Sequence, residues 1–268
     1  MSTLESTKSV KGTVFDIKEF GIHDGPGLRT TIFLKGCPLR CVWCHNPEGL
    51  SPHPEISYKK NVCIGCLECQ KECSHTDCIP FGRCLHVCPK NALTVIGKEY
   101  TDDELIKKIL KNYDIIKDGG VTFSGGEPLL QHEFLISLLE KLDGLLPRAI
   151  ETSGFASPSV FKRVISLCDL VYMDVKLADD EKHIKFTGVS NAQILENLEI
   201  LRESGVRCVI RTPIIPNIND SDEEKEKILS LVKDLDHEFL PFNTLAGAKY
   251  NNLGKEFPYE TLKTKGNL

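Results

Sequence analysis

The sequence predicts an α/β fold, a partial (β/α)6 TIM-like barrel that carries a small cysteine-rich insert. The first observation is a regular alternation of strand-like runs and helical patterns with short links, which is typical of a parallel sheet with right-handed crossovers. The second is that six strand-like runs are present, rather than the eight of a closed barrel. The third is a stretch, residues 52–97, that interrupts the alternation and holds seven of the twelve cysteines.

The strand-like runs are expected at residues 30–34, 120–124, 148–152, 170–176, 207–215 and 238–245. Helices are expected at residues 101–117, 132–145, 158–168, 192–204 and 221–235. Thr101 and Glu104 have the spacing of a capping box, and Ser221 with Glu224 repeats it. Gly205 is expected to end the helix before it. Chemistry in barrels of this type lies at the C-terminal ends of the strands, so residues that follow each strand are the candidates.

The chain is expected to have three parts. Residues 1–51 begin the barrel and carry the first cysteine motif, residues 52–97 form the insert, and residues 98–268 complete the barrel. The net charge of -5 gives no reason to expect nucleic acid or an anionic membrane as partner. Apolar runs are too short to span a bilayer, and the polar N-terminus does not resemble a signal peptide, so we expect a cytoplasmic protein.

The first cysteine motif, Cys37-x3-Cys41-x2-Cys44, follows the first strand-like run directly. Three thiolates leave one iron of a 4Fe-4S cluster without a protein ligand, and an open metal position marks a catalytic site. Such an iron can bind the amine and carboxylate of an amino-acid-like molecule and pass it one electron. A zinc knuckle or reduced thiols in a turn is the alternative, but no further Cys or His follows at zinc-finger spacing. Oxygen-sensitive clusters also indicate an anaerobic setting.

This motif, with an aromatic residue before its third cysteine, resembles the radical S-adenosylmethionine (SAM) signature. The preceding residues 21–34 are similar to the glycyl radical enzyme activating enzymes, the group that includes pyruvate formate-lyase activase. The resemblance extends from about residue 12 to about residue 254. It implies that SAM binds at the fourth iron and is cleaved reductively, and that the resulting radical abstracts hydrogen from a glycine of a partner enzyme. The residues it implies for catalysis are Cys37, Cys41, Cys44 and Lys176.

The insert contains ferredoxin-like cysteine spacing. One run begins at Cys63 and matches the first half of a bacterial ferredoxin pattern, and the run ending at Cys88-Pro89 matches the end of a second half. The last cysteine of each run ligates the other cluster in two-cluster ferredoxins. Carried over, one 4Fe-4S cluster would have the ligands Cys63, Cys66, Cys69 and Cys88. The second would have Cys73, Cys78 and Cys84.

The second cluster is one cysteine short, because Phe81 stands where a regular motif has cysteine. The candidates for a fourth ligand are His75, Asp77 and a small molecule. Other possibilities are a cluster that lacks one iron, a single cluster in the insert, or zinc. We favour two clusters with an atypical ligand, relaying electrons from a ferredoxin or flavodoxin. The insert resembles that of activases for decarboxylases, diol or choline lyases and aryl-succinate synthases.

Three further motifs stand at strand ends. The second strand-like run is followed by Ser124-Gly-Gly-Glu-Pro128, where small residues allow the backbone to approach a ligand closely. A simple turn before a helix is the alternative interpretation of this motif. The resemblance implies that Gly125, Gly126 and Glu127 face the amino group of SAM. It also implies that Lys176 contacts the SAM carboxylate or ribose. It places Glu151 and Asp174 beside SAM, where with Thr152 they would hold a monovalent cation. The family often has Asp at the position of Glu151, and a solvated loop is the alternative for both acids.

Four other residues are candidates through the resemblance. Arg211 would reach SAM or the substrate loop, with a structural salt bridge as the alternative. Trp43 would pack near adenine. Asn243 stands where pyruvate formate-lyase activase has histidine, and it can hydrogen-bond to SAM but cannot titrate. Asp24 resembles the loop that meets the substrate peptide, although an Asp-Gly turn explains it as well. The short tail after Gly254 is expected to lack the final helix of such activases.

These observations predict a monomeric activase whose partners are a glycyl radical enzyme and a ferredoxin or flavodoxin. One alternative is a radical SAM enzyme that acts on a small molecule or another peptide, which would cleave SAM without a glycyl radical partner. A second is an iron–sulfur electron-transfer protein, which would not cleave SAM. A third is a zinc-stabilised binding module, in which metal analysis would find zinc and no iron.

Overall fold

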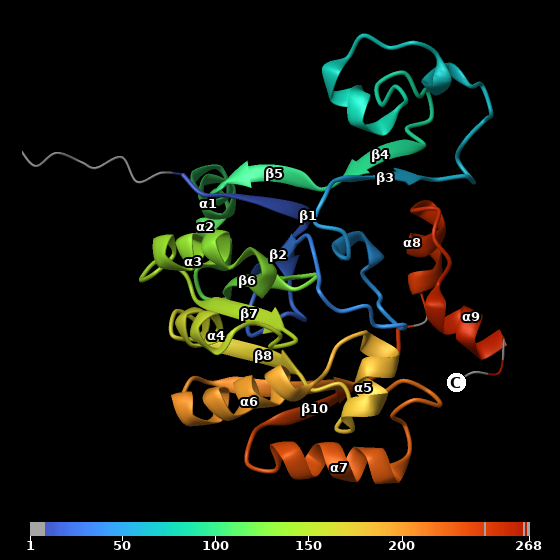
Figure 1. The fold of residues 1–268 in the computed structure, drawn as a ribbon. Coiled ribbons are helices and arrows are strands. Elements are labelled where there is room, and N and C mark those ends of the chain that lie inside the picture. Colours follow the sequence, from blue (N-terminus) through green and yellow to red (C-terminus); the bar gives the residue numbers. More distant parts are fainter. Residues whose placement is uncertain (1–8, 244, 265, 267–268) are drawn as a thin grey trace, which may run out of the picture.

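The fold is built around one eight-stranded sheet, in a computed structural model that describes residues 9–243, 245–264 and 266 (Figure 1). The strand order is β10-β9-β8-β7-β6-β2-β1-β5, and the six strands from β10 to β2 are parallel. Their bounds are β2 Arg29–Leu34, β6 Gly120–Gly125, β7 Arg148–Thr152, β8 Leu170–Asp174, β9 Cys208–Pro213 and β10 His237–Leu240. The predicted six-stranded parallel α/β fold is therefore confirmed.

Two antiparallel strands extend the sheet beyond the prediction. They are β1 (Lys11–Gly21), which pairs with β2, and β5 (Lys98–Thr101), which pairs with β1 at the edge. Parallel strands are buried on both faces, as β2 is, where all six residues are buried and Ile32, Phe33 and Leu34 form a short apolar run after three buried polar residues. Most side chains of β1 and all of those of β5 are partly or fully exposed, so neither strand forms such a run.

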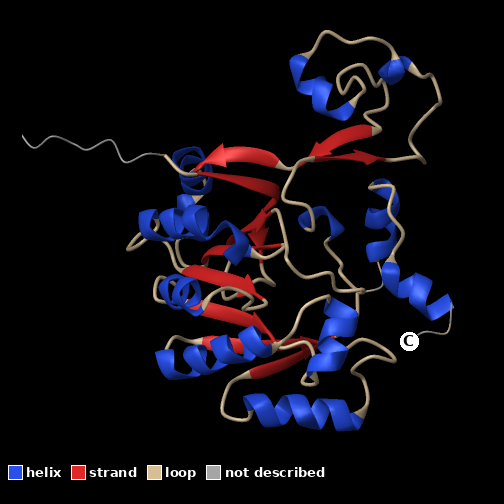
Figure 2. Ribbon diagram, in the orientation of Figure 1, coloured by secondary structure: helices blue, strands red, loops and turns tan. Residues whose placement is uncertain are grey.

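The helices that alternate with the parallel strands cover one face of the sheet, as Figures 1 and 2 show for α3, α4 and α6. This layer consists of α1 (Asp102–Leu110), α2 (Tyr113–Ile116), α3 (His132–Lys141), α4 (Pro158–Ile165), α6 (Ala192–Ser204) and α7 (Asp222–Val232). The main core lies beneath it and includes Phe123, Ile150 and Val171 from the strands. The predicted helix 101–117 is divided into α1 and α2. Its capping box between Thr101 and Glu104 is confirmed.

Three helices lie away from this layer, on the side where the loop after β2 runs: α5 (Asp180–Thr187), α8 (Ala246–Asn252) and α9 (Pro258–Thr264) (Figure 1). The short helix α9 follows Gly254, where no final helix was expected. A second apolar cluster joins these helices to the loop, with Trp43, Phe186, Tyr250 and Phe257 among its buried members. No helix in the described ranges is both long and apolar enough to cross a membrane.

The insert begins and ends in a separate hairpin formed by β3 (Glu55–Tyr58) and β4 (Leu93–Ile96). The cysteine-rich chain between them contains the short 3-10 helices η2 (Glu68–Gln70) and η3 (Thr76–Phe81). Figure 1 shows this unit beyond the edge of the main sheet. Glu55 anchors it, because its carboxylate pairs with Lys35 at 3.0 Å and with Lys255 at 2.6 Å. The Lys35 side chain, which follows β2, is completely buried in this contact.

Candidate functional site

The three-cysteine loop is held at the C-terminal end of β2 by backbone hydrogen bonds. Arg40 and Val42 donate their amides to the carbonyls of Thr187 and Phe186 at 2.6 and 3.0 Å, which fastens the loop to α5. The amide of Tyr259 donates to the Val42 carbonyl at 2.9 Å, so α9 contacts the loop from the other side. The cysteines of the loop are all free and partly buried: Cys37, Cys41 and Cys44.

Desolvation dominates the electrostatics of these thiols. Burial raises the pKa of Cys41 to about 12 and also raises the pKa values of Cys37 and Cys44. Lys176 opposes the shift in the pKa of Cys41, since its cation favours a thiolate. Metal ligation requires deprotonated thiols, so a bound cation would have to displace these protons. Three free thiols on one fixed loop fit the three protein ligands of an incomplete 4Fe-4S set.

The face of the sheet opposite the helix layer is polar at its centre. Side chains two residues apart on a strand share one face, and the residues concerned alternate with the apolar core residues of the same strands. The polar set is Thr31, Thr122, Ser124, Glu151, Asp174 and Arg211. An ordinary eight-stranded barrel fills this interior with branched apolar side chains. The centre of this inner face departs from that packing, and its polar groups suit contact with a polar ligand or with a segment of another chain.

The motif after β6 packs directly against the cysteine loop. The amides of Gly126 and Glu127 donate to the carbonyls of Leu34 and Gly36 at 2.9 and 2.8 Å. A Cβ atom at Gly125 would lie 2.3 Å from the Leu34 carbonyl oxygen, and one at Gly126 would lie 2.3 Å from that of Gly36. The glycines are therefore required by a close approach between backbones. They hold the loop after β6 beside the loop of the three cysteines.

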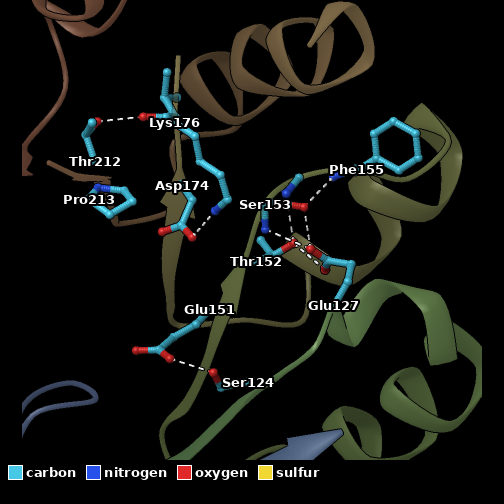
Figure 3. A network of polar contacts seen from close by, with 12 residues as sticks. Ser124, Glu127, Glu151, Thr152, Ser153, Phe155, Asp174, Lys176, Thr212 and Pro213 are labelled. Atoms are coloured by element: carbon cyan, nitrogen blue, oxygen red, sulfur yellow. Dashed lines mark hydrogen bonds and ion pairs between the residues drawn. The ribbon is translucent and has the colours of Figure 1, made fainter. Parts of the chain in front are cut away.

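Glu127 is fully buried, and four donors occupy its carboxylate (Figure 3). One oxygen accepts from the Thr152 hydroxyl at 2.6 Å and the Leu129 amide at 3.1 Å. The other accepts from the Ser153 amide at 2.8 Å and the Ser153 hydroxyl at 2.6 Å. Burial raises the pKa of Glu127, while the donors oppose that shift by favouring the ionised form. The carboxylate thus joins the loop after β6 to the loop after β7.

Glu151 lies at the end of β7 in a second polar contact (Figure 3). Its carboxylate accepts from the Ser124 hydroxyl at 2.6 Å and pairs with Arg211 at 2.8 Å. Arg211 also lies over the ring of Tyr172 at 3.5 Å and pairs with Glu238 at 3.3 Å. Burial raises the pKa of Glu151, and the cation of Arg211 limits that rise. Arg211 therefore forms a salt bridge with Glu151 on the inner face, which was the alternative to a contact with SAM or the substrate loop.

Asp174 and Lys176 form an ion pair of 2.5 Å at the end of β8 (Figure 3). Burial disfavours the Lys176 ammonium, but Asp174 and the nearby Cys41 outweigh it and raise the pKa of Lys176. Asn219 fixes the backbone here, because its amide group donates to the carbonyls of Lys176 and Pro213 at 2.9 Å each. Asn219 could not be predicted from the sequence, because it lies in a loop without a recognisable motif.

Tyr250 is a second residue that sequence analysis missed. It lies on α8 with 3% of its surface exposed. Burial raises its pKa, and Cys44 and Cys41 add to the shift, which places the phenol near the cysteine loop. Beside it on α8, Lys249 donates to Asn46 at 3.0 Å. The helix was not predicted, so neither contact could be found from the sequence pattern.

Three other predicted site residues, Trp43, Asn243 and Asp24, have different surroundings. Trp43 is 5% exposed and packs in the apolar cluster with Leu177 and Phe186. Asn243 is exposed and accepts from the amide of Leu245 at 2.9 Å. Asp24 lies in the loop before β2 and accepts from the Thr31 hydroxyl at 2.6 Å. Their roles in binding stay predictions.

The cysteines of the insert are gathered at two places. A cavity of about 200 Å³ is lined by the four predicted ligands of the first cluster, Cys63, Cys66, Cys69 and Cys88. This donor set and this space fit a 4Fe-4S cluster. The remaining three cysteines lie together with His75, and the ligand atoms of Cys73, His75, Cys78 and Cys84 are all within 4.8 Å of one another.

Comparisons with known proteins agree with this arrangement. Residues 31–229 match the Radical SAM superfamily. The 4-hydroxyphenylacetate decarboxylase activating enzyme of Clostridium scatologenes is 42% identical, over 93% of this chain and 88% of that protein. The isethionate sulfite-lyase activating enzyme of Oleidesulfovibrio alaskensis is 37% identical, over 96% and 92%. Among solved structures, Streptococcus suis SuiB bound to the precursor peptide SuiA has a TM-score of 0.51 at 13% identity, over 86% of this chain and 44% of that one, which shows the fold alone.

The chain belongs to the radical SAM superfamily. The superfamily match covers most of the sheet, from β2 to α7. Within the superfamily it is a glycyl radical enzyme activating enzyme, as its relatives over nearly the whole chain are.

Proposed function

We propose that the three-cysteine loop and the polar inner face together form the site where this activating enzyme generates a glycyl radical in a partner enzyme. When bound, the cluster and SAM supply an electron and a 5'-deoxyadenosyl radical that takes a Cα hydrogen from the partner's glycine. The single observation that carries the proposal is the position of the loop. It stands at the C-terminal end of β2, beside the polar residues that end the neighbouring strands.

The chain's own residues bind and orient the reactants. Cys37, Cys41 and Cys44 would hold the cluster and leave one iron to SAM. Lys176 is charged and mostly buried, so it suits the carboxylate or ribose of SAM. Asp174 and Glu151 lie at the ends of the neighbouring strands β8 and β7.

The backbone at Gly125 and Gly126 is proposed to face the amino group of SAM. Glu127 would act by holding that backbone in place, because its own carboxylate already has four donors. The monovalent cation is proposed at Glu151, Asp174 and Thr152. Trp43 and Asn243 are proposed to contact the nucleoside, and Asp24 the substrate peptide.

The partner is proposed to be a decarboxylase or another lyase. Relatives over nearly the whole chain are activating enzymes of 4-hydroxyphenylacetate decarboxylase, isethionate sulfite-lyase and indoleacetate decarboxylase. A glycine-bearing loop of the partner would enter along the polar inner face. A ferredoxin or flavodoxin would deliver the electron through a 4Fe-4S cluster on the four cysteines that line the insert cavity. The protein is proposed to work as a cytoplasmic monomer.

The test uses anaerobically reconstituted and reduced protein, SAM and a co-encoded glycyl radical enzyme. We expect 5'-deoxyadenosine and a glycyl radical signal in electron paramagnetic resonance. Cys41→Ala should abolish both, whereas the matched variant Cys208→Ala, in β9, should retain both. Formation of 5'-deoxyadenosine without any glycyl radical would favour action on a small molecule or another peptide. Absence of SAM cleavage would refute the proposal.

A further inference from the structure

The second cysteine group of the insert includes a histidine, His75, which is exposed. The Nδ1 atom of His75 lies 3.0 Å from the Cys73 sulfur and 3.8 Å from the Cys84 sulfur. Cys78 completes the group, in which all four ligand atoms lie within 4.8 Å of one another. Cys78 and Cys84 are only 3% and 2% exposed, so two of the four ligands come from the small interior of the insert.

We propose that Cys73, His75, Cys78 and Cys84 form a closed Cys3His site for a single tetrahedral metal ion of the zinc type. The site would replace the second 4Fe-4S cluster that ferredoxin-like spacing suggests. Three thiolates and one imidazole are a ligand set of structural zinc sites. The inference concerns the insert alone and does not depend on the identity of the partner enzyme.

The spacing of the ligand atoms separates the two kinds of centre. Around one zinc ion, bonds of about 2.3 Å to sulfur and about 2.0 Å to nitrogen place tetrahedral ligand atoms about 3.5–3.8 Å apart. A 4Fe-4S cluster binds each thiolate through a different iron, which spreads the ligand sulfurs to about 6 Å. The distances of 3.0 and 3.8 Å from the His75 Nδ1 atom to the sulfurs of Cys73 and Cys84 are near the single-ion values. All four ligand atoms lie within 4.8 Å of one another, which is closer together than the sulfurs around a cluster.

The two cysteine groups of the insert also differ in the space that they enclose and in the residue types that they contain. Four cysteines of the first group line a cavity of about 200 Å³, which is space that a cluster needs. In the second group Phe81 occupies the position of the missing cysteine, and His75 brings its nitrogen to the sulfurs instead. Phe81 leaves the group without a fourth cysteine, and the contacts of His75 supply a nitrogen that can serve as the fourth ligand.

The surroundings of the group orient its ligands. The amides of His75 and Leu85 donate to the sulfurs of Cys73 and Cys78 at 3.4 and 3.3 Å. The ring of His86 packs 4.6 Å from that of His75, and Asp77 holds His86 by a contact of 2.8 Å. The two amide donors fix the positions of the sulfurs, and the ring of His86 limits the orientation of the His75 ring.

A closed site of this kind has no open position for a substrate, so its role would be structural. The amide of Cys84 donates to the carbonyl of Cys69 at 2.9 Å, which connects the group to a ligand of the first cluster. The ion would therefore hold the chain around the electron-transferring cluster. The insert would contain one redox centre instead of two.

Metal and sulfide analysis of the anaerobically purified full chain tests the proposal. We expect about eight iron ions and about one zinc ion per chain. His75→Ala should lose the zinc and keep its iron, while the matched variant His53→Ala, at an exposed histidine before β3, should keep both. Cys66→Ser should lose about four iron ions and keep the zinc. SAM cleavage by the same preparations reports separately on the three-cysteine loop.

Two further measurements make the assignment specific. Cobalt added in place of zinc should give the visible absorption of a tetrahedral sulfur-rich site in the wild type, and His75→Ala should lose it. Phe81→Cys restores the ferredoxin spacing and is expected to exchange the zinc for about four additional iron ions. About twelve iron ions and no zinc in the wild type would overturn the proposal. Zinc that persists in His75→Ala but disappears in Cys66→Ser would also overturn it, since the ion would then lie at the first group.

Discussion

Replacing Glu127 by glutamine tests whether this carboxylate holds two strand ends together. The side chain is fully buried, and each of its oxygens accepts one hydroxyl and one backbone amide. Glu127→Gln keeps the size of the side chain but presents one NH2 group where an oxygen was. The hydroxyls of Thr152 and Ser153 can rotate to accept from that group. The backbone amides of Leu129 and Ser153 cannot, so either orientation of the glutamine leaves one amide without an acceptor.

The cost follows from these contacts. A buried donor without a partner costs about 1–3 kcal/mol. The remaining bonds lose the benefit of a charged acceptor, which adds about 1 kcal/mol. We therefore expect Glu127→Gln to lower the free energy of unfolding by about 2–4 kcal/mol. Glu127→Ala should lower it further, because all four donors then lose their acceptor.

Denaturant unfolding under anaerobic conditions measures this change as a lower midpoint at unchanged slope. Glu133→Gln is the matched control, since it removes the same charge from an exposed position on α3 and should change the free energy by less than about 0.5 kcal/mol. SAM affinity should fall with Glu127→Gln, because the loop of Gly125 and Gly126 loses its anchor. A Glu127→Gln variant as stable as the control would show that the carboxylate does not hold the two strand ends together.

Two further predictions concern the charged residues of the inner face. Lys176→Met removes the buried cation and should weaken SAM binding by about ten- to a hundredfold in equilibrium dialysis, as expected for one charge-assisted hydrogen bond. The control is Lys162→Met, at an exposed position on α4. Equal SAM affinity of the two variants would exclude a role of Lys176 in SAM binding. Burial raises the pKa of Glu151 and Arg211 limits that rise, so Arg211→Met should raise this pKa further. If ionised Glu151 is required, activity is present above its pKa and is lost as pH falls through it. The acid limb of the pH profile of SAM cleavage should therefore move to higher pH in Arg211→Met, and an unmoved or lowered limb would contradict this.

Local patterns were sufficient for the parallel part of the fold. Strands such as β2 and β6 are buried on both faces, and their short runs of β-branched and aromatic residues can be recognised directly in the sequence. The capping box at Thr101 is equally local, because its two partners are three residues apart. β1 and β5 are mostly exposed strands, and α8 is short, so none of them has a strong periodic pattern.

The candidate site also has one part that could be predicted from the sequence and another part that could not. The cysteine loop was predicted because all three thiols lie within eight residues of sequence. The salt bridge of Glu151 joins residues sixty positions apart, and the contact of Asn219 with the end of β8 spans 43. No spacing rule connects such pairs, since only the lateral order of the strands brings them together.

The six-stranded parallel fold, the three-cysteine loop and the shortage of one cysteine in the insert could all be inferred from the order of residues along the chain. These depend on residue type and on short spacings, which the covalent chain fixes before it folds. Three contacts became known from the folded chain alone: Glu127 joins two loops, Tyr250 packs in one apolar cluster with Trp43 of the cysteine loop, and His75 lies beside three cysteines. Those contacts depend on where separate segments meet in space, and packing of the whole chain sets that position.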